Sequence, residues 1–180
     1  MLSATLQWYD VDSDLFQYVY EHRDEFYSIY GERDVKRKIQ NVWGGGANRF
    51  VNKEGDQLVL DKKGFKRYVK RMEKANVDGW EDIASGAEMM NAEKLGDWKT
   101  YIALGTERIK QGKVSDLLLY NWGLRVNKQC KDKALRLLAA QWFDDAAVKA
   151  AKNEVERKGN MMSYRTFFEK LAKDLKADVQ

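Results

Sequence analysis

Apolar side chains recur at helical spacing along almost the whole chain. The first strong segment is VDSDLFQYVYEHRDEFYSIYG (11–31), in which the recurring positions are Leu15, Val19, Phe26, Ile29 and Tyr30. Steps of three and four place such residues on one face of a helix. Asp12 is the expected N-cap, Val11 and Phe16 have the spacing of a hydrophobic staple, and Gly31 is expected to end the helix.

The same spacing predicts further helices over 34–43, 61–75, 79–91, 97–111, 115–127, 132–155 and 161–177. Gly44, Gly45 and Gly46 are expected to interrupt or end the helix before them, because each costs up to about 1 kcal/mol relative to alanine. Residues 58–60 (Leu-Val-Leu) suit a short strand, but no partner strand is evident, so a loop with buried anchors is predicted. The expected fold is all-α, with about eight helices.

A weak internal period accompanies these helices. The segment LGDWKTYIALGTERI (95–109) has the character of the second half of a tetratricopeptide-type hairpin, although Tyr101 stands where a small residue is expected. Helix pairs starting near Gly79 and Ser115 are 36 residues apart, close to that repeat's period of about 34. The pattern predicts one domain, 1–180, built as a degenerate array of helical hairpins. An alternative subdivision separates 1–60 from 61–180.

Composition agrees with short connections between helices. The chain has no proline, where average usage gives roughly nine.

Residues 1–60 carry 7 basic and 10 acidic side chains, and residues 61–180 carry 25 basic and 18 acidic ones. No apolar run approaches the roughly 20 residues that span a bilayer, and no signal peptide is visible at the start.

Two motifs resemble ligand-binding loops but lack essential residues. Asp10, Asp12 and Asp14 have the spacing of an EF-hand calcium loop, yet Leu15 occupies the position that requires glycine. Acidic residues at a helix start, where the dipole is positive, are the preferred interpretation. The glycines at 44–46 are followed by no Lys-Ser or Lys-Thr pair, which argues against a phosphate-binding loop.

Histidine and cysteine chemistry is restricted by their number. His22 and Cys130 are each the only residue of their type, so they cannot build a His/Cys zinc site. His22 is expected on a polar surface. Cys130 has two lysine neighbours but no second cysteine, and it is expected in the turn of a helical hairpin with no chemical duty. No catalytic residue, metal ion or cofactor is predicted.

The predicted helix 61–75 carries the strongest charge pattern. Lys62, Lys66, Lys70 and Lys74 form one row and Lys63, Arg67 and Arg71 the adjacent row. The opposite stripe is apolar and includes two aromatic residues, Phe65 and Tyr68. This face is either solvated or a surface for a protein partner or an anion. Nucleic acid is the less favoured ligand, because the aromatic residues are not interleaved with the cations.

Three stretches carry a resemblance to a known family. They are YDVDSDLFQYVYEHRDEFYSIYGERDVKRKI (9–39), KGFKRYVKRMEKANVDGW (63–80) and the hairpin LLLYNWGLRVNKQCKDKALRLLAAQWFDDA (117–146). Together they resemble the helical region downstream of the thioredoxin-like domain in bacterial envelope thiol–disulfide oxidoreductase-like proteins. The resemblance implies a periplasmic or cell-envelope location. The family's working residues, a C-x-x-C pair and a cis-proline, have no counterpart here.

The sequence therefore predicts a non-catalytic helical interaction or scaffold domain. Its expected partner is a thioredoxin-like domain, and a second copy of the chain is the next candidate. Two alternatives remain. One is a binding module for nucleic acid or an anionic surface through the basic helix 61–75. The other is a carboxylate-dependent hydrolase, although adjacent acids such as Asp144 and Asp145 diverge by about 100° on a helix.

Overall fold

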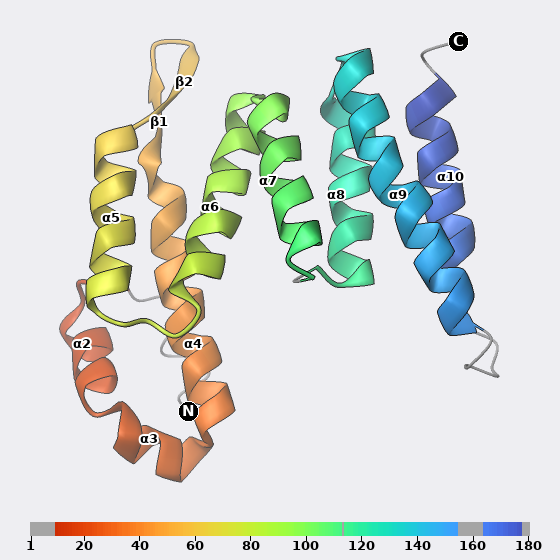
Figure 1. Ribbon diagram of the computed structural model, residues 1–180. Coiled ribbons are helices and arrows are strands. Elements are labelled where there is room, and N and C mark those ends of the chain that lie inside the picture. Colours follow the sequence, from red (N-terminus) through yellow and green to blue (C-terminus); the bar gives the residue numbers. More distant parts are fainter. Residues whose placement is uncertain (1–9, 113, 155–163, 178–180) are drawn as a thin grey trace. The chain divides into compact units, whose positions relative to one another are not determined.

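The structure is a computed structural model that describes residues 10–112, 114–154 and 164–177, and these residues are mostly helical (Figure 1). The chain divides into two compact units, Met1–Leu95 and Gly96–Gln180. The alternative boundary at residue 60 falls inside the first unit. The predicted all-α class with hairpin-like packed helices is confirmed, and a small β-hairpin is added to it.

The first unit combines six helices and one hairpin within its described part. In chain order these are α2 (Asp14–Glu21), α3 (Arg23–Tyr30), α4 (Glu32–Gly46), the 3-10 helix η2 (Ala47–Phe50), β1 (Val51–Glu54), β2 (Gln57–Leu60), α5 (Lys62–Lys74) and α6 (Trp80–Leu95). Its core gathers Phe16 from α2, Trp43 from α4, and Tyr68 and Met72 from α5, all buried. The core therefore joins segments far apart in the sequence.

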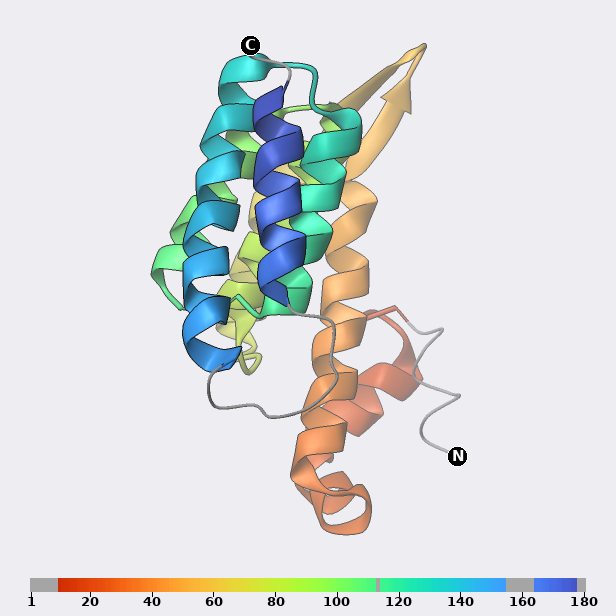
Figure 2. The same cartoon turned by 90° about the vertical axis from the view of Figure 1, so that its right-hand side faces the viewer.

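The second unit contains four helices within its described part, α7 (Trp98–Lys110), α8 (Asp116–Gln129), α9 (Lys133–Glu154) and α10 (Tyr164–Ala177). Figure 2 looks onto α10, which packs against both α8 and α9. Trp122 and Trp142 are buried and meet edge to face, with ring centroids 6.3 Å apart. The Trp142 indole N–H donates to the Thr106 hydroxyl at 3.0 Å. The predicted α8–α9 hairpin is thus confirmed.

The prediction of one continuous helix over the first segment is wrong. The chain leaves α2 at His22, whose φ and ψ are −99° and 22°, and α3 begins at the next residue. This break lets Phe16 of α2 and Tyr27 of α3 pack on the same core. The cap is also displaced, since Ser13 and not Asp12 accepts the hydrogen bond from the Phe16 N–H.

Several positions expected on the buried face of that segment are exposed. Val19 is buried and Phe26 is half-buried, but Leu15, Ile29 and Tyr30 keep 38%, 69% and 44% of their surface in solvent. Because two short helices meet the core at different angles, a single helical face does not describe both. The exposed apolar residues become candidates for a binding surface.

The prediction of a loop at residues 58–60 is also wrong. Strands β1 and β2 pair antiparallel, with Val51 opposite Leu60 and Glu54 opposite Gln57. Gly55 and Asp56 form the connection, and Gly55 has a φ of 61°, which glycine adopts without strain. Figure 1 shows the hairpin extending beyond the N-terminal end of α5. The partner strand was hidden because Val51–Glu54 alternates weakly and is largely polar.

The glycine run does not stop α4 where the sequence predicted. The helix continues through Gly46 and only then tightens into η2. A Cβ atom on Gly46 would lie 2.2 Å from the Tyr68 hydroxyl oxygen. That hydroxyl donates to the Trp43 carbonyl oxygen at 2.8 Å. Glycine at 46 therefore permits the close approach of α5 to the end of α4.

Replacing Gly46 tests this contact. We expect Gly46→Ala to lower the free energy of unfolding by about 1–3 kcal/mol, because Tyr68 is buried and cannot move aside freely. Gly45→Ala is the matched control, since a Cβ there meets no atom within 4 Å. It should be neutral or stabilising by up to about 1 kcal/mol. Urea unfolding of both variants gives the comparison, and equal effects would contradict this role for Gly46.

Candidate functional site

The basic face predicted on α5 is present and exposed. Asp61 caps the helix by accepting the Gly64 N–H at 2.8 Å, as the sequence indicated. Tyr68 and Met72 point into the core, so the opposite side of the helix faces solvent. All seven predicted residues lie on that exposed side: Lys62, Lys63, Lys66, Arg67, Lys70, Arg71 and Lys74.

Arg71 differs from the other six cations. Its guanidinium pairs with Asp12 at 2.5 Å and lies 5.5 Å from the centre of the Trp43 ring. It therefore serves the packing of the first unit. Among the residues that the structure describes, none of the other six cations pairs with a carboxylate. The surface available to a partner is thus the face formed by Lys62, Lys63, Lys66, Arg67, Lys70 and Lys74, called the basic face below.

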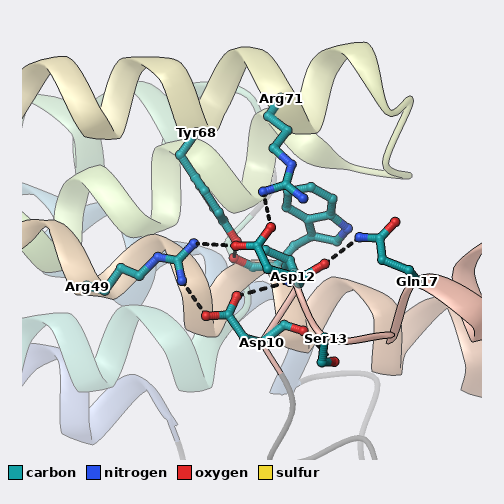
Figure 3. Close-up of polar contacts among 9 residues, drawn as sticks. Asp10, Asp12, Ser13, Gln17, Arg49, Tyr68 and Arg71 are labelled. Carbon is teal, nitrogen blue, oxygen red and sulfur yellow. Dashed lines mark hydrogen bonds and ion pairs between the residues drawn. The ribbon is translucent and has the colours of Figure 1, made fainter. Parts of the chain in front are cut away.

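Arg71 belongs to a charged cluster at the start of the chain's described part (Figure 3). Asp12 lies between Arg71 and Arg49, with an oxygen 3.5 Å from the Arg49 guanidinium. Asp10 also pairs with Arg49. The Arg49 guanidinium in turn stands 5.4 Å from the centre of the Tyr68 ring. The cluster joins residues 10–12 to η2 and α5.

This cluster explains the acidic motif that resembled a calcium loop. Asp10 and Asp12 are paired with arginines, Asp10 with Arg49 and Asp12 with both Arg49 and Arg71. Val11 between them is fully buried and anchors the segment. Over the described ranges, no group of three or more histidine, cysteine or acidic side chains is placed to hold a metal ion. The acids fix the N-terminal segment to the unit.

The electrostatics of Asp12 follow from the same contacts. Its hydrogen bond from Arg71 holds the pKa of the carboxyl below its usual value, and Arg49 contributes in the same direction. Partial burial opposes this shift. Burial raises the pKa of the Tyr68 hydroxyl, which stays a neutral donor to the Trp43 carbonyl. These shifts favour the charged form of Asp12 and the neutral form of Tyr68.

A polar pocket of about 320 Å³ lies between α2–α3, α4 and the loop after α5. Lys36 bridges Glu32 at 2.7 Å and Asp78 at 3.5 Å. The hydrogen bond to Glu32 is the main cause that raises the pKa of Lys36. The pocket brings together residues that the sequence did not link, and its principal side chains are Tyr20, Arg23, Tyr27, Glu32, Lys36 and Asp78. Its carboxylates pair with Lys36, and Arg23 donates to the Tyr20 carbonyl oxygen, so both cations of the pocket have polar partners within it.

A row of aromatic rings runs along the outside of α2 and α3. Tyr18 lies on His22 with ring centroids 4.4 Å apart and meets Phe26 edge to face at 6.4 Å. Phe26 stacks on Tyr30 at 6.2 Å. Tyr18 and Tyr30 are exposed, whereas His22 and Phe26 are half-buried, so one side of this aromatic row (Tyr18, His22, Phe26 and Tyr30) is open to solvent. The sequence placed Phe26 and Tyr30 on the apolar face of the predicted helix and His22 on a polar surface, but it did not identify the four rings as one row.

His22 and Cys130 occupy the places expected of them. His22 is partly exposed, and its Nδ1 lies 3.0 Å from a Glu25 carboxylate oxygen. Cys130 caps the C-terminus of α8 at the turn into α9 and is buried. Desolvation raises the pKa of its thiol, and the Sγ lies 3.8 Å from the Asp132 carbonyl oxygen. These surroundings stabilise the protonated thiol.

The adjacent acids on α9 do not converge. Asp144 pairs with Lys176 of α10 at 2.7 Å, whereas Asp145 is exposed. The pair therefore offers no shared proton and no facing carboxylates of the kind that hydrolases use. Nothing in their geometry supports acid–base catalysis at this place.

Comparisons with protein-family models, with curated proteins and with solved structures returned no match. No helix in the described part of the chain is long and apolar enough to cross a membrane. The fold therefore defines a mostly helical protein whose chain divides into two compact units. The resemblance to thioredoxin-associated helical regions stays a prediction.

The charged cluster gives a pH-dependent prediction. A carboxyl whose pKa is lower in the folded chain than in the unfolded chain stabilises the fold at pH values above its unfolded-state pKa. This contribution is lost as the pH falls through the folded-state pKa. We expect Asp12→Asn to be less stable than the parent at pH 7 by at most about 1 kcal/mol, because the side chain is half exposed.

The difference should shrink as the pH is lowered from 7 to about 2, because Asp12 gains a proton and the ion pairs are lost. Urea unfolding at the two pH values measures it. Asp56→Asn is the control, because Asp56 is exposed in the β1–β2 connection and contacts no cation within the described residues. A difference for Asp12→Asn that persists undiminished at low pH would show that the ion pairs are not its cause.

Cys130 should react slowly in the folded chain. Its burial and raised pKa predict alkylation at neutral pH at least about tenfold slower than a free thiol. The same chain in concentrated urea is the control and should react at the free-thiol rate. The chain should also fail to reduce insulin disulfides. Fast alkylation under native conditions would overturn the assignment of Cys130 as an inert residue.

Proposed function

We propose that the chain is a non-catalytic helical interaction module, which binds another folded protein through the aromatic row on α2 and α3. The observation that carries the proposal is the exposure of this row in continuous ring contact. Aromatic side chains contribute most of the energy at many protein interfaces. Rings already held by one another lose little conformational entropy when a partner covers them.

Aliphatic neighbours enlarge this surface. Leu15 precedes Tyr18 by three residues on α2, and Ile29 follows Phe26 by three on α3, so each lies beside a ring. Both are exposed. Half-buried Phe26 connects the row to the core, which makes the surface a rigid platform. A rigid apolar platform of this kind suits a folded partner.

Two partners fit the proposal. The resemblance favours a thioredoxin-like domain, which in a longer polypeptide would supply the thiol chemistry that this chain's single cysteine does not. A second copy of the chain is the other partner. Both give the chain the same role, a supporting surface without chemistry of its own.

A second candidate function uses the basic face of α5. Six cations without a carboxylate partner among the described residues support binding to an anionic surface or nucleic acid. The aromatic residues of this helix pack inward, with Tyr68 buried and Phe65 half-buried. They provide no stacking platform for bases, which makes nucleic acid the weaker of these ligands.

Hydrogen exchange tests the proposed function. The chain is studied alone at low and high concentration, and also expressed together with the sequence encoded upstream of Met1. We expect the amides of α2 and α3 to exchange at least about tenfold more slowly in one of these settings, because a partner covers them. Tyr18→Ser with Tyr30→Ser should abolish the protection.

The matched control replaces exposed apolar residues of the second unit, Leu117→Ser with Val148→Ser. This control should leave the protection of α2 and α3 unchanged. Identical exchange in all settings, or protection that survives loss of both tyrosines, would contradict a docking role for the aromatic row.

A further inference from the structure

We infer that the partner of the aromatic row is the basic face of α5 on a second copy of this chain. The inference rests on the proposed function and names the occupant of the same surface. It starts from a property of the described first unit, which carries two exposed surfaces of opposite character. One is acidic and aromatic, and the other is basic.

The surface on α2 and α3 is acidic around its rings. Residues 14–30 contain four acidic side chains and one basic one. That basic residue, Arg23, lies 5.2 Å from the centre of the Tyr20 ring and donates to the Tyr20 carbonyl oxygen, so it is held at the polar pocket. The four acids that remain around the row are exposed: Asp14, Glu21, Asp24 and Glu25.

The basic face is the complement of this surface. Residues 62–74 contain seven basic side chains and one acidic one. Arg71 is occupied by Asp12, and the other six cations are exposed. Five of these six are lysines, whose long aliphatic stems cover apolar surface while the ammonium group stays near water. Lysine stems can therefore lie on Tyr18 and Tyr30 while their charges meet the surrounding carboxylates.

Ring faces add a second attraction. A cation within about 6 Å of an aromatic centroid gains roughly 0.5–1 kcal/mol at an exposed site. The chain already uses this contact internally, because Arg71 lies over Trp43 and Arg49 over Tyr68. The exposed rings of the aromatic row offer the same contact to cations from outside.

Both surfaces belong to the first unit, so two copies related by a two-fold axis can make the contact twice. Such an arrangement is closed and leaves neither surface open. Making the contact twice also brings two small surfaces toward the roughly 1,200–2,000 Å² typical of a stable interface. Because charge dominates it, association should weaken with salt, as the Debye length falls from about 10 Å at 0.1 M to about 3 Å at 1 M.

Sedimentation of charge-reversed variants tests the inference. The parent is expected to form dimers that dissociate as salt rises. The variant Lys66→Glu with Lys70→Glu changes the basic face, and Glu21→Lys with Glu25→Lys changes the acidic surface. Each variant alone should associate at least about tenfold more weakly than the parent, because like charges then face one another.

An equimolar mixture of the two variants should associate again, because each reversed surface then meets its reversed complement. Lys170→Glu with Lys173→Glu, on exposed positions of α10, is the control for net charge and should dimerise like the parent. Circular dichroism melts verify that every variant is folded.

The sedimentation experiments would overturn the inference if the parent stays monomeric at all concentrations, if neither charge reversal weakens the dimer, or if the mixture of variants fails to associate. Protection of the aromatic row by the upstream segment in a monomeric chain would also overturn the second copy as partner. That last result would leave the proposed function intact, since the row would still bind a folded domain. The two proposals can therefore fail separately.

Discussion

The hydrogen bond from the Tyr68 hydroxyl to the Trp43 carbonyl organises the first unit. It brings α5 against the last turn of α4, where only glycine at position 46 leaves room for the phenol. The rings of Trp43 and Tyr68 then lie 5.4 Å apart and form the centre of the core. Arg49 and Arg71 cover these two rings from outside, so the polar cluster depends on the buried contact beneath it. The charged and apolar parts of the unit are thus built on one interaction.

The features that the sequence predicted correctly depend on interactions between residues close together in the chain. Asp61, Asp97 and Ser115 were expected to start helices, and each side chain accepts an N–H of the first turn. The amphipathic pattern of α5 placed its buried and exposed residues correctly, because one regular helix packs there on one side. Likewise, the helical hairpin expected around Cys130 is formed, and Trp122 and Trp142 pack against each other inside it.

The failures of prediction share a tertiary cause. The break at His22 has no proline or glycine, so it follows from two short helices adapting to one core and not from local propensity. The continuation of α4 through its glycines costs helix propensity, which the packing of Tyr68 offsets. Arg71 was grouped with the lysines of its row, since its contact with Asp12 joins residues 59 positions apart in the chain. The aromatic row was missed although its rings lie four residues apart, because Phe26 and Tyr30 were expected on the buried face of the helix.

These tertiary contacts also divide the seven cations of α5 into two groups. Arg71 takes part in packing within the unit, and the other six cations remain on the surface. The N-terminal acids are divided in the same way, because Asp10 and Asp12 hold arginines while the acids of α2 and α3 remain outside. Charge inside the cluster is balanced locally and adds stability to the unit. Outside the cluster, the exposed acids of α2 and α3 and the exposed cations of α5 lie on different helices, and the proposed dimer would bring these opposite charges together.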